Sequence, residues 1–179
     1  EKLVGGVLGG SLRQGIFKIG DSVEIRPGRI MIEKNQQVWK PITTKITSLI
    51  SGSLSLESVG PGGSIGVLTS LDPSVVKSDK LVGNVIGHPE KLPNVLNELT
   101  LETHLLQRVV GVADEVSVEP IKINEVLMLN VNTAATVGTV TKIKKKEILC
   151  KLKLLVCAEN DSRITISRMV GNRFRLIGY

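Results

Sequence analysis

Short runs of alternating apolar and polar residues fill most of the chain, and this period of two predicts β-strands. The first half contains runs at residues 4–12, 21–28, 40–50, 63–71 and 80–87. The second half contains runs at residues 97–106, 124–132, 138–145, 146–156, 163–170 and 172–179. Gly, Pro, Asn and Asp, which favour turns, separate the runs. Only residues 93–99 could form one or two helical turns. We therefore predict an all-β fold.

The segment GHPEKLP, at residues 87–93, interrupts the strands with two prolines and a glycine. Such a segment is typical of a linker between compact units. We predict two consecutive small β-barrels, at residues 1–88 and 89–179, because five or six strands are enough to close a small barrel. The first barrel has one strand fewer than expected, so we expect the natural chain to begin upstream of Glu1.

The composition favours a polyanionic partner but not base stacking. The net charge of +6 comes from 23 basic and 17 acidic residues, which favours partners such as RNA. Aromatic residues make up only 2% of the chain, so there is little material for the aromatic platforms of common single-strand RNA readers. We expect any RNA contact to be mainly electrostatic.

The basic residues are concentrated near the end of the chain. Residues 139–179 hold ten Lys or Arg residues against three acidic ones. The cations that alternate along the predicted strands, and so share a face within each segment, are Lys142, Lys144, Lys151, Lys153, Arg173 and Arg175. These residues form either a phosphate-facing surface or an ordinary solvated strand face. Charge alone does not separate the two interpretations.

The cysteines and histidines do not form a metal-binding pattern. Cys150 and Cys157 lie seven residues apart in one predicted strand, so strict alternation places them on opposite faces and argues against a disulfide. His88 and His104 do not supply a zinc-ligand spacing with them. We expect buried thiols, no metal and a cytoplasmic protein, because the chain also lacks a run long enough to span a membrane and a signal segment.

Two glycine-rich motifs superficially resemble catalytic or nucleotide-binding sites. The glycines of VGGVLGG lack the Gly-Lys pair of a phosphate-binding P-loop, so tight turns or bulges explain them better. The sequence GGSIG matches the nucleophile elbow of serine hydrolases at Ser64, with Asp72 or Asp79 and His88 or His104 as possible partners. That motif requires a helix after the serine, whereas a strand is predicted here. We therefore predict no catalytic residues, and a hydrolase using Ser64 is a remote alternative.

Segments covering almost the whole chain resemble the gamma subunit of archaeal and eukaryotic translation initiation factor 2, with an archaeal character. They are residues 4–28, 39–49, 60–87, 105–111, 119–138 and 163–179. The run DPSVVKSDKLVG, from Asp72 to Gly83, and the ending RLIGY are the most particular to this family. The glycine turns also occur in other translational GTPases. A barrel fragment of an elongation factor or a selenocysteine-specific factor is therefore the main alternative.

The resemblance implies a division of labour between domains. In that family a G domain, which binds GTP and Mg²⁺, precedes two β-barrels like those of elongation factor Tu. Together the three domains deliver initiator methionyl-tRNA to the small ribosomal subunit. Only the two barrels are similar to this sequence, so the resemblance implies no cofactor and no enzymatic activity for this segment.

The resemblance also implies contact residues. Those at the cleft that receives the tRNA 3′ end are Lys45, Gly62, Gly63 and Ser64. Those in exposed turns that bind the alpha subunit are Gly5, Gly6, Gly9 and Gly10. The beta subunit is expected on the G domain. The basic surface of the second barrel is expected to face RNA of the small ribosomal subunit.

Overall fold

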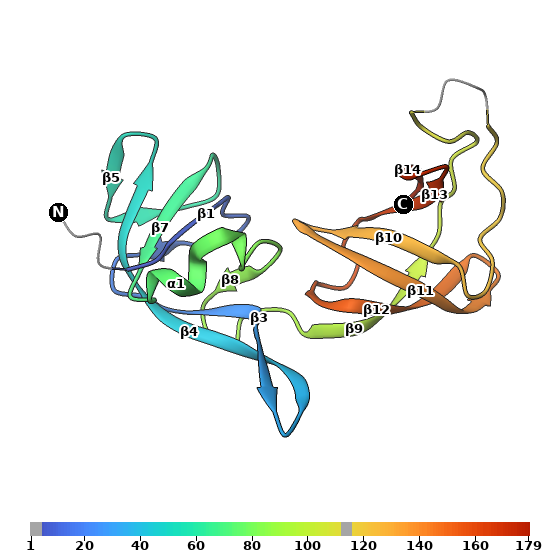
Figure 1. Ribbon diagram of the computed structural model, residues 1–179. Coiled ribbons are helices and arrows are strands. Elements are labelled where there is room, and N and C mark those ends of the chain that lie inside the picture. Colours follow the sequence, from blue (N-terminus) through green and yellow to red (C-terminus); the bar gives the residue numbers. More distant parts are fainter. Residues whose placement is uncertain (1–4, 112–115) are drawn as a thin grey trace. The chain divides into compact units, whose positions relative to one another are not determined.

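Two compact units, Glu1–Leu92 and Pro93–Tyr179, make up the computed structural model (Figure 1). The structure describes residues 5–111 and 116–179, and only the backbone of residues 36 and 37. Strands dominate both units and curl into barrel-like sheets, so the predicted all-β fold is confirmed. Within the described residues, no helix is long and apolar enough to cross a membrane.

The boundary between the units follows Leu92, a few residues after the predicted boundary at residue 88. Arg26 donates a hydrogen bond from Nη1 to the carbonyl of Leu92, at 3.3 Å. The Leu92 side chain packs on Gly87, where a Cβ would lie 2.7 Å from it. These contacts hold residues 89–92 against the first unit.

The first unit has a six-stranded sheet and a separate two-stranded pair. Its strands are β1 (Val7–Gly10), β2 (Phe17–Lys18), β3 (Ser22–Glu33), β4 (Gln36–Ser51), β5 (Leu54–Leu56), β6 (Ser58–Val59), β7 (Ile65–Thr69) and β8 (Val85–Gly87). The sheet order is β1-β7-β4-β3-β8, β5 pairs with β4, and β2 pairs with β6. The core cluster is small and consists of Phe17, Val23, Ile46, Leu49, Ile65 and Val67.

A bulge divides the long hairpin of β3 and β4. The register changes between Ile25, which faces Ile42, and Arg29, which faces Lys40. Gly28 lies in this bulge at φ +92°, and a Cβ there would overlap the Lys40 carbonyl. Beyond the bulge the hairpin projects from the rest of the unit, below β3 and β4 in Figure 1.

The predicted helical turns at residues 93–99 are wrong. β9 (Val95–Glu102) begins there, because Val95 and Leu96 pair with β12 at Cys157 and Val156. A helical turn forms instead at α1 (Pro73–Val76), followed by the 3₁₀ turn η1 (Lys77–Asp79). The Asp72 carboxylate accepts a hydrogen bond from the Ser74 amide at 2.7 Å, and bonding to Ser74 lowers the pKa of Asp72.

The second unit is one sheet whose two edges meet. After β9 come β10 (Val126–Val131), β11 (Ala134–Lys144), β12 (Glu147–Cys157), β13 (Ile164–Val170) and β14 (Arg173–Gly178). The sheet order is β14-β13-β10-β11-β12-β9. A bridge between Leu105 and Gly178 joins the segment after β9 to β14. Its core is large, with Leu127, Leu129 and Val140 fully buried.

Both cysteines are buried free thiols, as predicted. Cys150 lies in the main core, where burial raises the pKa of its thiol to about 11, so the thiol stays protonated at neutral pH. Cys157 lies outside that cluster and donates a hydrogen bond to the Pro93 carbonyl at 3.2 Å. A register shift between Lys151 and Val156 lets the neighbours Val156 and Cys157 both be buried.

Candidate nucleic-acid interface

Four exposed lysines lie on the outer face of the ladder formed by β11 and β12. We call Lys142, Lys144, Lys151 and Lys153 the lysine face. On β12 the lysines alternate with buried residues such as Leu152, which point into the core. On β11, Lys142 pairs with Leu149 and Lys144 with Glu147, and these partners belong to the same outer set as Lys151. The structure therefore brings the four lysines onto one surface.

A bulge in β11 is responsible for this placement. Thr136, Gly138 and Val140 are buried at even positions, so strict alternation would turn Lys142 and Lys144 toward the core as well. The register shifts between Val140 and Lys142, and this one-residue slip turns the following side chains outward. The lysine face thus depends on an irregularity that the alternation pattern does not contain.

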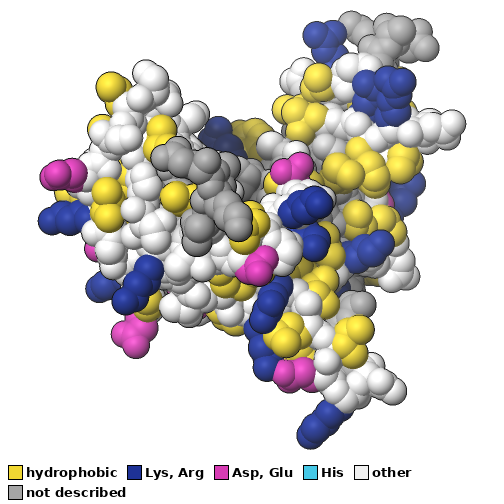
Figure 2. Space-filling view, turned by 60° about the vertical axis from the view of Figure 1, so that its left-hand side comes forward, with side chains coloured by type: hydrophobic (Ala, Val, Ile, Leu, Met, Phe, Trp, Pro, Cys, Tyr) yellow, Lys and Arg dark blue, Asp and Glu magenta, His cyan; other side chains and the backbone are white. Residues whose placement is uncertain are grey.

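Carboxylates share this face with the lysines. Glu147 lies between Lys144 on β11 and Glu102 on β9, and Lys151 lies opposite Glu98. On the side of the molecule drawn in Figure 2, Lys and Arg side chains do not form one continuous patch, and apolar side chains lie between them. The lysine face is therefore a mixed surface with a small positive excess, weaker than the sequence count of ten cations against three acids suggests.

Arg173 and Arg175 lie away from the lysine face. Both are on β14, which borders β13 and the segment around Leu105 but not β11 or β12. Arg175 faces Arg168 across the ladder and is only partly exposed. Its Nε is buried, and no described residue accepts a hydrogen bond from it. The predicted set of six cations is therefore divided into two groups.

The residues predicted for the tRNA 3′-end cleft lie at opposite ends of β7. Lys45 is exposed, and its amide donates to Ser70 Oγ at 3.3 Å, just after β7 ends. Gly62, Gly63 and Ser64 form the exposed turn before β7 begins. Six extended residues span roughly 20 Å. The structure thus keeps Lys45 apart from the turn, and one small ligand could not contact both groups.

The four glycines predicted to bind the alpha subunit fall into two pairs with different surroundings. Gly5 lies at φ +120°, and a Cβ there would overlap the Thr69 carbonyl. Gly6 is buried, with Val76 2.9 Å from its Cβ position. Their expected exposure in a turn is wrong, because both glycines pack closely against neighbouring backbone or side chains. Gly9 and Gly10 belong to β1, the first strand in the sheet order, and nothing lies within 4 Å of their Cβ positions.

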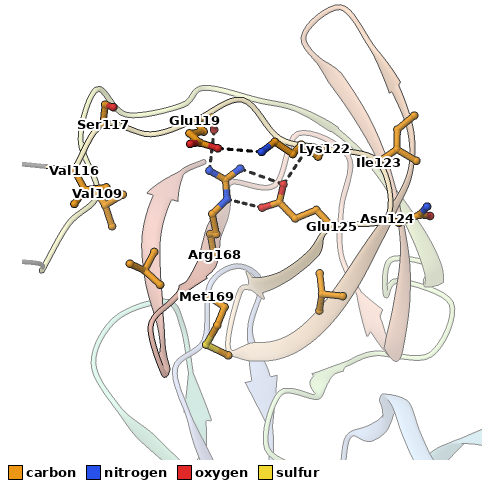
Figure 3. A pocket seen from close by; sticks show the side chains of 12 residues that line it. Val109, Val116, Ser117, Glu119, Lys122, Ile123, Asn124, Glu125, Arg168 and Met169 are labelled. Atoms are coloured by element: carbon orange, nitrogen blue, oxygen red, sulfur yellow. Dashed lines mark hydrogen bonds and ion pairs between the residues drawn. The ribbon is translucent and has the colours of Figure 1, made fainter.

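A pocket of about 490 Å³ in the second unit was not predicted from the sequence (Figure 3). Arg168 forms one wall and donates from Nε and Nη2 to both carboxylate oxygens of Glu125, at 2.5 and 3.1 Å. It also donates to the carbonyls of Glu119 and Pro120. Every nitrogen of its guanidinium is therefore engaged. We interpret Arg168 as a clamp that fixes the loop before β10 to β13, and not as a ligand-binding group.

No group of three or more described His, Cys, Asp or Glu residues could hold a metal ion.

The carbonyl of Ser64 accepts a hydrogen bond from Ser51 Oγ at 3.1 Å in an open turn. His88 instead lies near Ile16, at 3.2 Å from its carbonyl, and near the Asp21 carboxylate. A strand, β7, follows Ser64 where the hydrolase motif requires a helix. The local geometry thus argues against a nucleophilic serine.

Comparisons with known proteins agree with this architecture. Residues 97–179 match the family model described as initiation factor eIF2 gamma, C terminal. All 179 residues align with the translation initiation factor 2 subunit gamma of Pyrococcus furiosus and of Thermococcus kodakarensis at 55% identity, and of Methanocaldococcus jannaschii at 51%. Each alignment covers the whole chain and 44% of the relative, so the chain spans less than half of their length.

A solved structure resembles the chain in fold. The crystal structure of the bacterial selenocysteine-specific elongation factor EF-Sec superposes with a TM-score of 0.70. The match covers 99% of this chain and 26% of that one, at 20% sequence identity. At this identity the likeness supports the barrel fold and does not extend to function.

Proposed function

We propose that the chain belongs to the gamma-subunit family of translation initiation factor 2 and is the tRNA- and partner-binding β-barrel portion of such a subunit. The observation that carries this proposal is the 55% identity over the whole chain. The 20% identity to a selenocysteine-specific factor gives much weaker support to the alternative of another translational GTPase.

In this proposal, the whole protein delivers initiator methionyl-tRNA to the small ribosomal subunit in the cytoplasm. GTP and Mg²⁺ bind in the part of the relatives that this chain does not match. The absence of a Gly-Lys pair from the sequence supports this assignment, because a P-loop requires one. The segment then contributes binding surfaces and no hydrolysis.

We assign the first unit to the tRNA end and the alpha subunit. Lys45 supplies a positive charge beside the end of β7, and Gly62, Gly63 and Ser64 form a separate turn with open backbone. Since these groups are far apart, one contacts the tRNA end and the other the surrounding RNA or protein. For the alpha subunit, Gly9 and Gly10 keep their predicted role because the space beside them is open.

We assign the lysine face to RNA of the small ribosomal subunit. Four lysines that neutralise phosphates release a similar number of counterions, which gives a slope of log affinity against log salt of roughly −3. Because Glu98, Glu102 and Glu147 lie on the same face, they lower the affinity and favour phosphates held close to the lysine ends.

Binding of the 179-residue chain to structured ribosomal RNA between about 50 and 200 mM salt tests this assignment. Changing Lys144, Lys151 and Lys153 together to Glu should flatten the slope by roughly two units and leave the contribution of Lys142. Folding should persist, because exposed substitutions usually cost under about 0.5 kcal/mol. A matched control changes the exposed Lys18, Lys34 and Lys91 of the first unit to Glu, which alters the net charge equally. An unchanged slope in the first variant, or equal losses in both, would contradict the assignment.

A further inference from the structure

We infer that His104, Tyr179 and Arg163 form a stacking site for an unpaired RNA base beside the lysine face. We call these three residues the aromatic platform. This inference deepens the proposed function and rests on it, because the RNA assigned to the lysine face would supply the base. It also revises the expectation, drawn from the 2% aromatic content, that the chain has little material for base stacking.

The seam of the second barrel holds the platform in place. His104 and Tyr179 exchange backbone hydrogen bonds, with the amide of His104 donating at 2.8 Å and that of Tyr179 at 3.2 Å. Next to them Gly178 faces Leu105. A Cβ on Gly178 would lie 2.6 Å from the His104 carbonyl, so the two backbones approach as closely as glycine allows. Two residues that are 75 positions apart in the chain are thereby held side by side.

The side chains are stacked and still accessible. The ring centroids of His104 and Tyr179 are 5.2 Å apart, and the ring planes differ by 17°. The Arg163 guanidinium carbon lies 4.9 Å from the Tyr179 ring centroid. His104 is 51% and Tyr179 44% exposed. Because neighbouring groups already order these rings, a base that stacks on them costs little further side-chain entropy.

The surrounding charge favours RNA as the occupant. The amide and hydroxyl of Thr103, the residue before His104, both donate to the Lys146 carbonyl, at 2.7 and 2.8 Å. The turn at Lys145 and Lys146 is continuous with Lys144 of the lysine face. The opposing charges are Glu102, whose carboxylate lies 3.6 Å from His104 Nε2, and Glu147, which pairs with Glu102 across the ladder. Flat groups beside a line of cations match a base and its phosphates, a combination common to proteins that bind unpaired RNA.

Two RNA hairpins test the inference. Each carries one 2-aminopurine, which is unpaired in the first hairpin and base-paired in the second. The wild-type 179-residue chain should bind the first hairpin about tenfold more tightly. Stacking should also quench the fluorescence of the unpaired 2-aminopurine. His104→Ala should abolish both the preference and the quenching, whereas His104→Phe, which keeps a flat ring, should retain them. The salt slope should stay the same in both variants, because neither changes a lysine.

The outcomes separate this inference from the proposed function. Equal affinities for the two hairpins with a steep salt slope would overturn the aromatic platform alone. A preference that survives His104→Ala, with the thermal unfolding temperature unchanged, would also overturn it. Failure to bind either hairpin at low salt would overturn both the platform and the RNA assignment of the lysine face. Quenching by the wild-type chain needs no variant, so the inference stays testable if His104→Ala unfolds.

Discussion

The two units share a fold class but are stabilised differently. Among its described residues, the second unit buries fifteen in one core cluster, and its edges join at Leu105 and Gly178. The described part of the first unit buries six residues in its main cluster and includes two-residue strands such as β2 and β6. Glycines at tight positions occur in both units, for example Gly5 and Gly28 in the first and Gly138 and Gly178 in the second. The same architecture can therefore be built around cores of different size, with glycines where backbones approach closely.

The difference extends to the surfaces that each unit offers. The first unit exposes open backbone at Gly62 and Gly63 in the turn before β7 and at Gly9 and Gly10 of β1. The second unit exposes long cationic side chains on the bulged ladder of β11 and β12. Open backbone suits close approach by a folded partner, whereas a cationic ladder suits phosphates. The two units are thus suited to different kinds of partner.

A core truncation should have the largest effect and should be confined to one unit. Leu127 is fully buried in the second unit, and Leu127→Ala should lower the free energy of unfolding of that unit by about 3 to 4 kcal/mol. Trp39, the only tryptophan, lies in the first unit, so its fluorescence reports that unit alone. Circular dichroism reports the unfolding of both units. In urea, part of the circular dichroism transition should therefore move to a lower urea concentration, while the Trp39 transition stays in place.

The matched variant is Leu49→Ala, at a fully buried position of the first unit. It should shift the Trp39 transition and leave the second unit unchanged. If either variant moved both probes together, the two units would unfold as one, and the comparison between independently stabilised units would fail.

A pair of glycines tests the dependence of the first unit on backbone geometry. Gly28 and Gly20 both have φ +92°, but a Cβ would overlap the Lys40 carbonyl only at Gly28. Gly28→Ala should cost about 3 kcal/mol from strain and steric overlap, and Gly20→Ala about 1 kcal/mol from φ strain alone. Urea unfolding followed by Trp39 fluorescence measures both. Equal losses would show that conformation, and not close packing at the bulge, explains the need for glycine.

The Arg168 clamp should have the smallest effect of the three. Arg168 and Glu125 are 18% and 16% exposed, so Arg168→Gln, which removes a charged hydrogen-bond network, should cost about 2 kcal/mol. The ion pair of Lys122 and Glu119 is 73% and 69% exposed, and Lys122→Gln should have no measurable effect. Thermal unfolding of the second unit compares them. Equal effects would show that the clamp does not hold the loop before β10.

Local pattern was enough to predict most of the strands. Each predicted run overlaps a strand, because alternation between a buried and an exposed face is visible in neighbouring residues. It failed at residues 93–99, where a pairing with β12 more than fifty residues away imposes a strand. The predicted boundary at residue 88 precedes the end of the first unit at Leu92, because Leu92 contacts Arg26, which lies 66 positions earlier in the chain.

By itself, then, the sequence predicted the all-β class, a division into two units and the family resemblance, because composition, alternation and family motifs are properties of neighbouring residues. The tertiary structure decided which predicted residues share a surface. A bulge turned Lys142 and Lys144 outward, β7 separated Lys45 from Ser64, and barrel closure brought His104 next to Tyr179. The physical reason is that register, bulges and closure minimise the free energy of contacts between distant segments, which no local pattern records.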